Sequence, residues 1–379
     1  MKRKRVGIIF TNDSNWVGGT YYLLNLISSF LSLEDKDKPK VIIFSWESKD
    51  SDIVKNTGYP YLSFQNLYIP YNLPQRILNK FFPDVCKKLF KNDIKSNAVD
   101  VIFPYNFQTK LKSVPKKIYW IPDFQEFFYP EFFSTSELEV RQKNKEAIAQ
   151  QNQFLVLSSL ASKKDFQKIY PLATCPTKVI NFAVTHPPYS HLKIDDLKSK
   201  FSILQEFFFS PNQFWKHKNH LIVIKAIKIL KDQGKEPLVV FTGKEHDYRN
   251  PTYSDDLKRF VVENHLTKNI LFLGFIDRAE QLQLMNYAKA VIQPSLFEGW
   301  STVVEDAKSM NQFVIASDID VHREQLKNNC RFFAPNDEIA LAKIISELHE
   351  LPELIKQKID YTVNVKLFAK SFMEILSQK

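Results

Sequence analysis

The feature that most constrains the fold is a short apolar run, then a turn that contains glycine, then a helix, repeated along the chain. Its clearest instance follows the apolar residues 290–292, where Gly299 lies in the turn and residues 303–310 have helical spacing. Glu298 and Glu305 occupy this stretch with six residues between them. A strand, a glycine turn and a helix N-terminus form an anion site, because unpaired N–H groups face the ligand. Alternatively, Thr302 caps the helix and forms a capping box with Glu305 that only closes it.

The alternation of strand and helix runs through the chain twice, in residues 1–185 and in residues 203–353. Strands that alternate with helices pair in parallel, so the predicted fold class is α/β with two doubly wound, Rossmann-like domains facing across a cleft. Residues 186–202 begin with a proline pair and form the predicted linker. Residues 354–379 contain a predicted helix from about Leu354 to Leu376, which we expect to pack back on the first domain. The predicted strands are 5–10, 40–45, 99–104, 117–121, 153–158, 178–182, 206–210, 237–242, 270–273, 290–292 and 313–317.

Composition and charge restrict the kind of protein further. The 379 residues include no apolar run near the roughly 20 residues that a membrane span needs. The three cysteines are far apart, which argues against a disulfide framework and favours a reducing cytoplasm. The net charge is +10, and residues 1–185 hold 26 Lys and Arg against 17 Asp and Glu. This basic half, with a basic amphipathic helix predicted over 75–95, suits an anionic partner such as a phospholipid surface, a phosphorylated lipid carrier or nucleic acid, or is only a solvated surface.

Three further loops follow predicted strands. Gly18 and Gly19 open a helix, where they either accept an anion or allow tight packing, and the GxGxxG of nicotinamide and flavin sites is missing there. Asp123 follows the strand at 117–121, at the sheet edge where such folds bind ligands. The aromatic residues between 124 and 133 either cradle a sugar or lipid or fill the domain. Lys218 lies at a helix start, where a cation opposes the helix dipole and so indicates a bound anion.

Together these stretches resemble the retaining glycosyltransferases of the GT-B fold, of the family-4 type (glycosyl transferases group 1), over nearly the whole chain. The resemblance rests on Ser295–Thr302 with Glu305, on Phe214–His220 and on Leu273–Ile276, with weaker support from Gly18-Gly19 and Pro122-Asp123.

The resemblance implies a nucleotide diphosphate sugar as donor. It implies Asp123, Lys218 and Glu298 as catalytic residues: Glu298 at the donor sugar hydroxyls, Lys218 at the pyrophosphate and Asp123 on the acceptor side. Glu305 would hold the ribose hydroxyls. The implied donor-binding residues are Gly18, Gly19, Gln213, Lys218, Phe275, Ile276, Glu298, Gly299, Trp300, Ser301, Thr302 and Glu305.

The chain departs from the family pattern in three places. The family's glutamate pair has seven intervening residues instead of six. The family's Gly-Arg before the lysine is Asn212-Gln213 here, so one phosphate-binding cation is missing, with His217 or Lys216 as its substitute. The family's histidine before Asp123 is Pro122, which puts an acceptor-side role that depends on that histidine in doubt.

We therefore expect a cytoplasmic glycosyltransferase, peripheral on the inner face of the membrane, that transfers a sugar to an acceptor hydroxyl with retention of configuration. Its expected partners are a nucleotide-sugar donor, a saccharide or lipid-linked acceptor from lipopolysaccharide or cell-surface glycan synthesis, and an anionic membrane surface. No cofactor is expected, and no metal site is predicted, because His217 and His220 lack a third ligand. The alternatives are a nucleotide-sugar epimerase or phosphorylase of the same fold, a non-catalytic partner subunit, and a basic nucleic-acid-binding protein, for which the expected signatures are missing.

Overall fold

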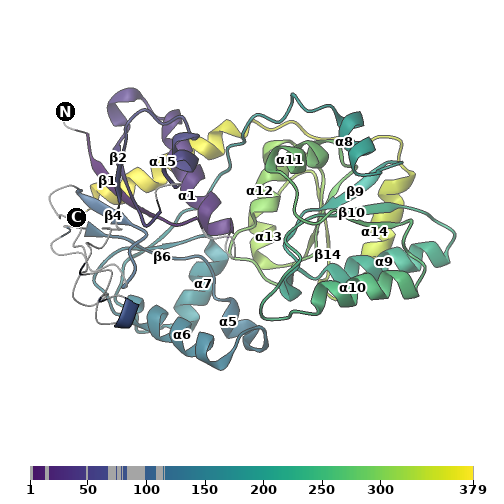
Figure 1. Cartoon of the computed structure of the whole chain (residues 1–379), viewed down its shortest axis with the longest axis horizontal. Helices are drawn as coiled ribbons and strands as arrows, with labels where there is room; N and C mark the ends of the chain where they lie inside the picture. The colour runs from purple at the N-terminus through teal and green to yellow at the C-terminus, as the bar shows by residue number, and fades with distance from the viewer. Residues whose placement is uncertain are drawn as a thin grey trace.

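The computed structural model describes residues 3–12, 17–47, 50–66, 99–107 and 116–378, together with residues 74, 78, 80–82 and 114. It consists of two lobes, each built on parallel strands with helices packed against them (Figure 1). The fold is GT-B, so the predicted fold class is confirmed. The predicted helix over 75–95 lies almost entirely outside the described residues. Within the described part of the chain, no helix is both long enough and apolar enough to cross a membrane.

The first lobe contains a five-stranded parallel sheet in the order β3-β2-β1-β4-β5 and a three-stranded sheet in the order β6-β7-β8. Residues 116–121 join the two sheets, because β5 pairs with β4 and β6 pairs with β7. The strands are β1 (Arg5–Phe10), β2 (Lys40–Ser45), β3 (Leu62–Asn66), β4 (Val101–Phe103), β5 (Lys116–Lys117), β6 (Tyr119–Ile121), β7 (Leu155–Leu157) and β8 (Thr177–Val179). Its helices are α1 (Val17–Ser29), α2 (Asp50–Lys55), α5 (Gln125–Phe128), α6 (Thr135–Ala149) and α7 (Leu160–Ile169), with 3-10 turns η1 (Phe30–Ser32), η2 (Asp35–Asp37) and η4 (Pro130–Phe132).

The second lobe contains a six-stranded parallel sheet in the order β11-β10-β9-β12-β13-β14, which is the doubly wound arrangement. Its central strand, Phe207–Ser210, shows why the strands of this sheet have apolar sequences. Phe208 enters one hydrophobic core and Phe207 and Phe209 enter the other, because helices cover both faces of the sheet. The strands are β9 (Phe207–Ser210), β10 (Leu238–Phe241), β11 (Ile270–Phe272), β12 (Val291–Gln293), β13 (Val314–Ser317) and β14 (Cys330–Phe333). The helices are α8 (Ile194–Lys200), α9 (His220–Asp232), α10 (Tyr253–Glu263), α11 (Arg278–Tyr287), α12 (Thr302–Ser309), α13 (Asp320–Gln325) and α14 (Glu338–Glu350), with the 3-10 turn η5 (Lys216–Lys218).

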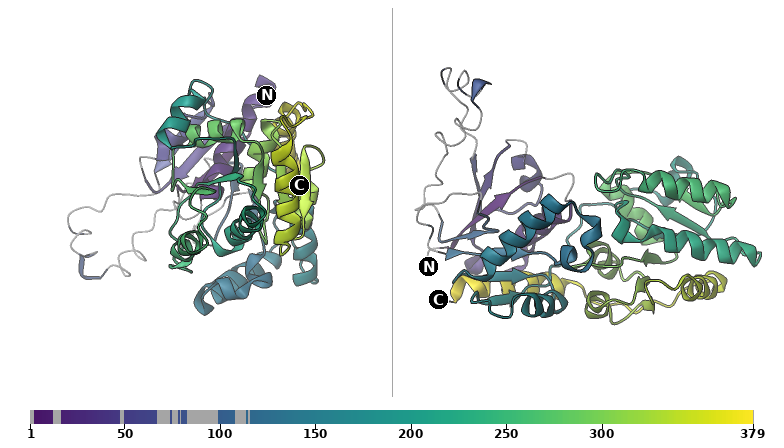
Figure 2. Two further views of the ribbon diagram at one scale, coloured as in Figure 1. Left: turned by 90° about the vertical axis from the view of Figure 1, so that its right-hand side faces the viewer. Right: turned by 90° about the horizontal axis from the view of Figure 1, so that it is seen from below.

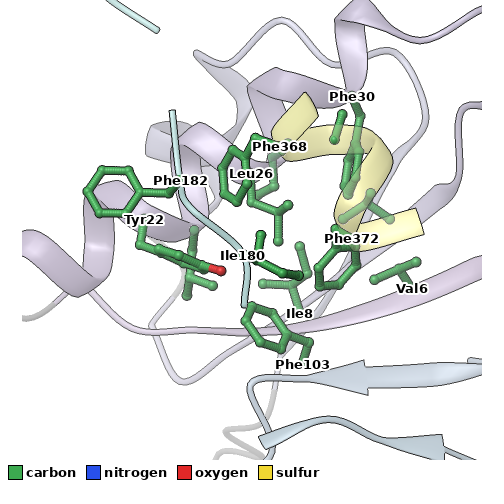
Figure 3. Packing of buried hydrophobic residues seen from close by; sticks show 14 of the residues in the cluster. Val6, Ile8, Tyr22, Leu26, Phe30, Phe103, Ile180, Phe182, Phe368 and Phe372 are labelled. Atoms are coloured by element: carbon green, nitrogen blue, oxygen red, sulfur yellow. The ribbon is translucent and has the colours of Figure 1, made fainter. Parts of the chain in front are cut away.

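The chain passes between the lobes twice. It leaves the first lobe after β8 and returns after α14, where an extended segment leads to α15 (Thr362–Ser377). Figure 2 shows this returning segment and α15 running along both lobes. Phe368 and Phe372 of α15 are fully buried beside Val6, Ile8 and Phe30, so the last helix completes the core of the first lobe (Figure 3).

Three sequence predictions about secondary structure need correction. The predicted linker 186–202 contains α8, because Leu197 is buried in the core of the second lobe. The predicted C-terminal helix begins at Thr362 instead of Leu354, since residues 351–361 cross between the lobes in a non-helical conformation. Ser301, not Thr302, caps α12: its hydroxyl accepts from the Val304 N–H, and Glu305 turns away from the predicted capping box.

Candidate functional site

The two lobes enclose a cavity of about 450 Å³. The loops that line it in the second lobe follow β9, β10, β11 and β12, at the carboxyl ends of strands on either side of the point where the strand order reverses. Open parallel sheets bind ligands at this position. The first lobe contributes the start of α1 and the segment after β6. The sequence-predicted residues that line the cavity are Gly18, Gly19, Asp123, Gln213, Lys218, Phe275, Ile276, Glu298, Gly299, Trp300, Ser301 and Thr302.

At one edge of the cavity the lobes touch through their backbones. A Cβ atom placed on Gly299 would lie 2.0 Å from the Pro122 carbonyl oxygen and 2.8 Å from the Asp123 Cβ. Any larger residue at 299 would therefore force the segment after β6 away from the turn after β12. Gly299 is required for this close approach of the two lobes.

Lys218 and Glu298 form the charged centre of the second-lobe wall. The Lys218 Nζ atom donates to Glu298 Oε1 at 2.6 Å, and the two side chains are 17% and 9% exposed. The same carboxylate oxygen accepts from Ser295 Oγ at 2.7 Å and from Gln293 Nε2 at 2.9 Å. Three donors on one oxygen fix the orientation of the carboxylate next to the cavity. Residues 80 positions apart are thus brought together, as the sequence predicts.

The loop that carries Lys218 is held in place by its neighbours. Gly243 has a φ of +154° and lies so close to Asn212 that a Cβ would meet the Asn212 carbonyl oxygen at 2.1 Å. Asn219 adopts a left-handed conformation and donates to the Pro294 carbonyl at 3.2 Å and to the Pro335 carbonyl at 2.9 Å. The loops after β9, β10 and β12 therefore form one packed unit, which positions Lys218 against Glu298.

Glu305 does not line the cavity, which corrects the expectation that it faces the donor. Its side chain is 1% exposed. Oε1 accepts from Lys308 Nζ at 2.8 Å and from Gln325 Nε2 at 3.0 Å, while Oε2 accepts from the Tyr361 hydroxyl at 2.5 Å. Because these donors already satisfy the carboxylate inside the protein, it has no direct route to a ligand in the cavity.

The acidic residue of α12 that lines the cavity is Asp306, which the sequence analysis missed. Seven residues separate it from Glu298, the spacing that the sequence analysis found missing for Glu305. Asp306 Oδ1 accepts from Arg278 Nη2 at 2.7 Å and lies 3.1 Å from His186 Nε2. Arg278 and His186 lower the pKa of Asp306 against the opposing effect of burial, so the carboxylate is ionised. Applying the family's spacing of seven intervening residues to Glu298 would have identified Asp306 from the sequence.

The cations at the cavity differ from those expected. Lys216 does not line it, and its Nζ lies 5.7 Å from the centre of the Phe132 ring. His217 lines it, but burial and the neighbouring Lys218 and Arg249 hold the pKa of His217 well below its ordinary value, so the ring is neutral. Neither residue replaces the missing arginine as a cation. The other cationic side chains in the lining are Lys244 and Arg278.

The first-lobe wall is organised around Asp123. Its Oδ1 accepts from the Gln125 N–H at 3.1 Å, and its carbonyl oxygen accepts from Lys145 Nζ at 2.6 Å. Lys145 also pairs with Glu126, which is fully buried, with a separation of 2.5 Å. This buried pair fixes the backbone that approaches Gly299, while the Asp123 side chain lies at the cavity.

Several buried polar atoms in the cavity wall have no hydrogen-bond partner within the described part of the protein. In the described residues, 16 buried side-chain atoms lack a hydrogen-bond partner, and six of them belong to residues of the lining. These are Tyr22 OH, Gln125 Nε2, Gln213 Nε2, His217 Nδ1, Arg278 Nε and Asp306 Oδ2. Buried polar atoms without partners are rare in native proteins, so their clustering here marks a site that a polar ligand completes.

Of the aromatic residues after Asp123, Phe124 and Phe127 pack in a core of the first lobe, Phe128 and Tyr129 contact the second lobe, and none of them lines the cavity. Phe128 stacks on Phe297 with ring centres 5.4 Å apart, and the Tyr129 hydroxyl lies 3.4 Å from the Leu296 carbonyl. Among the described residues, no three His, Cys, Asp or Glu side chains form a group that could hold a metal ion. Asp-x-Asp sequences occur at 35–37, 50–52 and 318–320, and none of them lines the cavity.

Comparison with known proteins supplies the remaining findings. Residues 195–364 match the family described as Glycosyl transferases group 1. The chain is 26% identical over 241 residues to the O-antigen chain mannosyltransferase RfbU of Salmonella typhimurium, a match that covers 64% of this chain and 63% of the length of that relative. Among solved structures, Anabaena Alr3699/HepE in complex with UDP-glucose is 17% identical with a TM-score of 0.63, covering 99% of this chain and 95% of the other. WaaG, a glycosyltransferase involved in lipopolysaccharide biosynthesis, is 13% identical with a TM-score of 0.59, covering 97% and 95%.

Proposed function

We propose that the chain is a member of the glycosyl transferases group 1, the family that its residues 195–364 match, and that it transfers a sugar from a nucleotide diphosphate donor to a hydroxyl of a saccharide acceptor. The observation that carries this proposal is the Lys218–Glu298 pair at the wall of a cavity between two Rossmann-like lobes. A fixed carboxylate suits the hydroxyls of a donor sugar, and a cation beside it suits the diphosphate that departs.

The nucleotide end of the donor lies, in this proposal, along α12 and the loop after β11. Ser301 and Thr302 stand at the N-terminus of α12, where the helix dipole favours the diphosphate. The Ser301 N–H already donates to Gln325 Oε1 and the Val304 N–H to Ser301 Oγ. Asp306 takes the ribose-binding role that the sequence analysis gave to Glu305, because Asp306 Oδ2 is buried in the lining without a partner. Phe275 and Ile276 line the cavity and contact the base.

The reaction breaks the bond between the anomeric carbon and the diphosphate oxygen and forms a bond from that carbon to the acceptor oxygen, while the acceptor hydroxyl gives its proton to the departing diphosphate. We propose retention of configuration, which follows the family resemblance. Lys218, with Lys244 and Arg278, offsets the charge of the departing diphosphate, so transfer is proposed to need no metal. Asp123 stands on the opposite wall and faces the acceptor.

The acceptor class is proposed from the relatives. The Salmonella relative is an O-antigen chain mannosyltransferase, and WaaG is involved in lipopolysaccharide biosynthesis. We therefore propose a saccharide acceptor on a lipid-linked or cell-surface glycan, with the reaction in the cytoplasm at the inner face of the membrane. The basic first half, +9 of the net +10, would face the anionic lipid. Flotation with vesicles of acidic lipid at low salt tests this location, and a protein that stays at the bottom of the gradient contradicts it.

A thermal-shift screen tests the donor site. UDP-, GDP-, ADP- and dTDP-sugars are each added to the wild type and to Lys218→Ala, Asp306→Asn and Glu305→Gln. A donor present at 100 times its Kd stabilises the folded protein by about 2.7 kcal/mol, which raises the melting temperature by several degrees. We expect one nucleotide to stabilise the wild type and Glu305→Gln, and to lose most of its effect on the other two variants. If no nucleotide stabilises the wild type, the donor-site proposal fails.

A further inference from the structure

Helix α12 is the element that connects the cavity to both crossings between the lobes. The first crossing, residues 181–187, contacts it through two side chains. Trp300, just before the helix, donates from Nε1 to the Phe182 carbonyl at 3.0 Å. His186 lies 3.1 Å from Asp306 Oδ1 and 3.3 Å from Ser309 Oγ.

The second crossing, residues 351–361, contacts the same helix through Tyr361. The Tyr361 hydroxyl donates to Glu305 Oε2 at 2.5 Å and accepts from the Val184 N–H of the first crossing at 3.0 Å. One hydroxyl thus joins both crossings to α12. Asn311, two residues beyond the helix, accepts from the Ile359 N–H at 2.6 Å and adds a second tie to this crossing.

The buried position of Glu305 needs an explanation, because a carboxylate that is 1% exposed is costly unless it is paired. Lys308 and Gln325 of its own lobe already supply partners to Oε1. Oε2 accepts from the Tyr361 hydroxyl of the crossing segment. Burial and the Glu305 carboxylate hold the pKa of Tyr361 well above its ordinary value, so the hydroxyl remains a donor. Glu305 therefore holds the second crossing in position against α12.

That position matters for the cavity, since one end of the same helix carries cavity residues. Ser301, Thr302 and Asp306 line the cavity, and Gly299 just before them touches Pro122 of the opposite lobe. A shift of the crossings against α12 would change the distance between the second-lobe wall and the first-lobe wall that holds Asp123. The two adjacent carboxylates therefore face different parts of the protein: Asp306 faces the cavity, and Glu305 faces the second crossing.

We infer that Glu305 and Tyr361 are positioning residues, which hold α12 against the interlobe crossings so that the donor-binding and acceptor-binding walls keep their productive separation. This inference deepens the proposed function and rests on it.

The test is Tyr361→Phe, which removes the hydroxyl and keeps the ring. Tyr287→Phe is the matched control, because Tyr287 is 52% exposed. Nucleotide affinity is measured by calorimetry and sugar transfer by steady-state kinetics. We expect Tyr361→Phe to bind the nucleotide within about twofold of wild type and to transfer about tenfold or more slowly, since a small misplacement across a reacting pair is costly. The control is expected to match wild type in both measurements.

Transfer by Tyr361→Phe at the wild-type rate would overturn the inference. So would equal losses in nucleotide affinity and transfer, since the hydroxyl would then act through donor binding. If Tyr361→Phe does not fold, Glu305→Gln keeps the shape of the acidic residue and is judged by the same two criteria.

Amide hydrogen exchange separates a failure of this inference from a failure of the proposed function. Tyr361→Phe is expected to raise exchange at Val184, whose N–H bonds to the hydroxyl. If the wild type binds no nucleotide but this exchange rises, the proposed function has failed while the tie exists. If exchange at Val184 is unchanged, the tie itself is refuted.

Discussion

Gly299→Ala is the sharpest perturbation of the cavity, because it acts on the contact between the lobes and on no titratable group. The added Cβ would stand 2.0 Å from the Pro122 carbonyl oxygen, whereas ordinary van der Waals contact begins at 3.4 Å. The two backbones must therefore separate by about 1.4 Å, the difference between these two distances. Neither neighbour can give way cheaply, since the nearest atom is backbone and Lys145 fixes that backbone by donating to the Asp123 carbonyl.

A misplacement of about 1 Å between reacting groups costs roughly 100-fold in rate, so we expect sugar transfer by Gly299→Ala to fall by about that factor. Nucleotide affinity should change by about threefold or less, because most residues proposed to hold the donor belong to the second lobe. Steady-state transfer assays and calorimetric titration measure the two quantities separately. Transfer within threefold of wild type, in a variant that unfolds like wild type, would refute the close approach of the lobes during catalysis.

Gly18→Ala provides the control for this variant. Gly18 also lines the cavity, but a Cβ there meets no protein atom within 4 Å. Alanine is a better helix former than glycine, so the variant should be as stable as wild type or more stable by up to about 1 kcal/mol. Any loss of transfer in Gly18→Ala would report approach of the ligand to α1, whereas the loss in Gly299→Ala reports separation of the lobes.

Three further predictions follow from the site and the seam between the lobes. Lys218→Ala should lower transfer by roughly 100- to 1,000-fold in a kinetic assay, because it removes the cation beside Glu298, and an unchanged rate would exclude a role at the diphosphate. Burial lowers the pKa of His220 to about 3, so below pH 6.5 the unfolded chain binds a proton that the folded chain does not. As the pH falls below 6.5, this group should lower the free energy of unfolding by about 1.4 kcal/mol per pH unit. Urea titrations at pH 7.5 and 5.5 should show a smaller change of stability with pH in His220→Gln than in the wild type. Glu324→Ala should cost about 1 kcal/mol in urea unfolding, because Glu324 accepts from the Leu160 and Ala161 N–H groups at the start of α7 in the other lobe, whereas an unchanged midpoint would make that contact energetically neutral.

The fold was largely predictable from the sequence because its strands are covered on both faces. A strand such as Phe207–Ser210 is fully buried and therefore reads as an apolar run regardless of its neighbours. The sequence analysis missed α2, β3, α5, α8, α13 and β14, and local reasons account for three of them. Strand β14 (Cys330–Phe333) lies at the sheet edge and is mostly half-exposed, and helix α13 is only six residues long. Helix α8 is buried chiefly through one residue, Leu197, which gives no helical repeat in a polar segment.

The site was predictable where it depends on loops after strands and not where it depends on the rotation of a helix. Glu298, Lys218 and Asp123 all follow strand ends, and the topology of a parallel sheet brings such loops to one edge. Glu305 and Asp306 are adjacent on α12, and with 3.6 residues per turn their side chains point about 100° apart. Which of them faces the cavity is decided by how the helix packs, and the contacts that bury Glu305 include Tyr361, a residue 56 positions away.

The loss of the family's arginine before Lys218 has a physical counterpart elsewhere in the cavity. Gln213 occupies that place and has a buried Nε2 without a partner, so it offers a neutral donor where the family has a cation. Arg278 lines the cavity from the start of α11, but its Nη2 is bound to Asp306 and its Nη1 to Gln281, which leaves Nε as the atom without a partner. A cation held by a carboxylate attracts a diphosphate less strongly than an unpaired one. Lys218 is likewise paired, with Glu298, so in the proposed reaction the departing charge is shared among Lys218, Lys244, Arg278 and the N-terminus of α12.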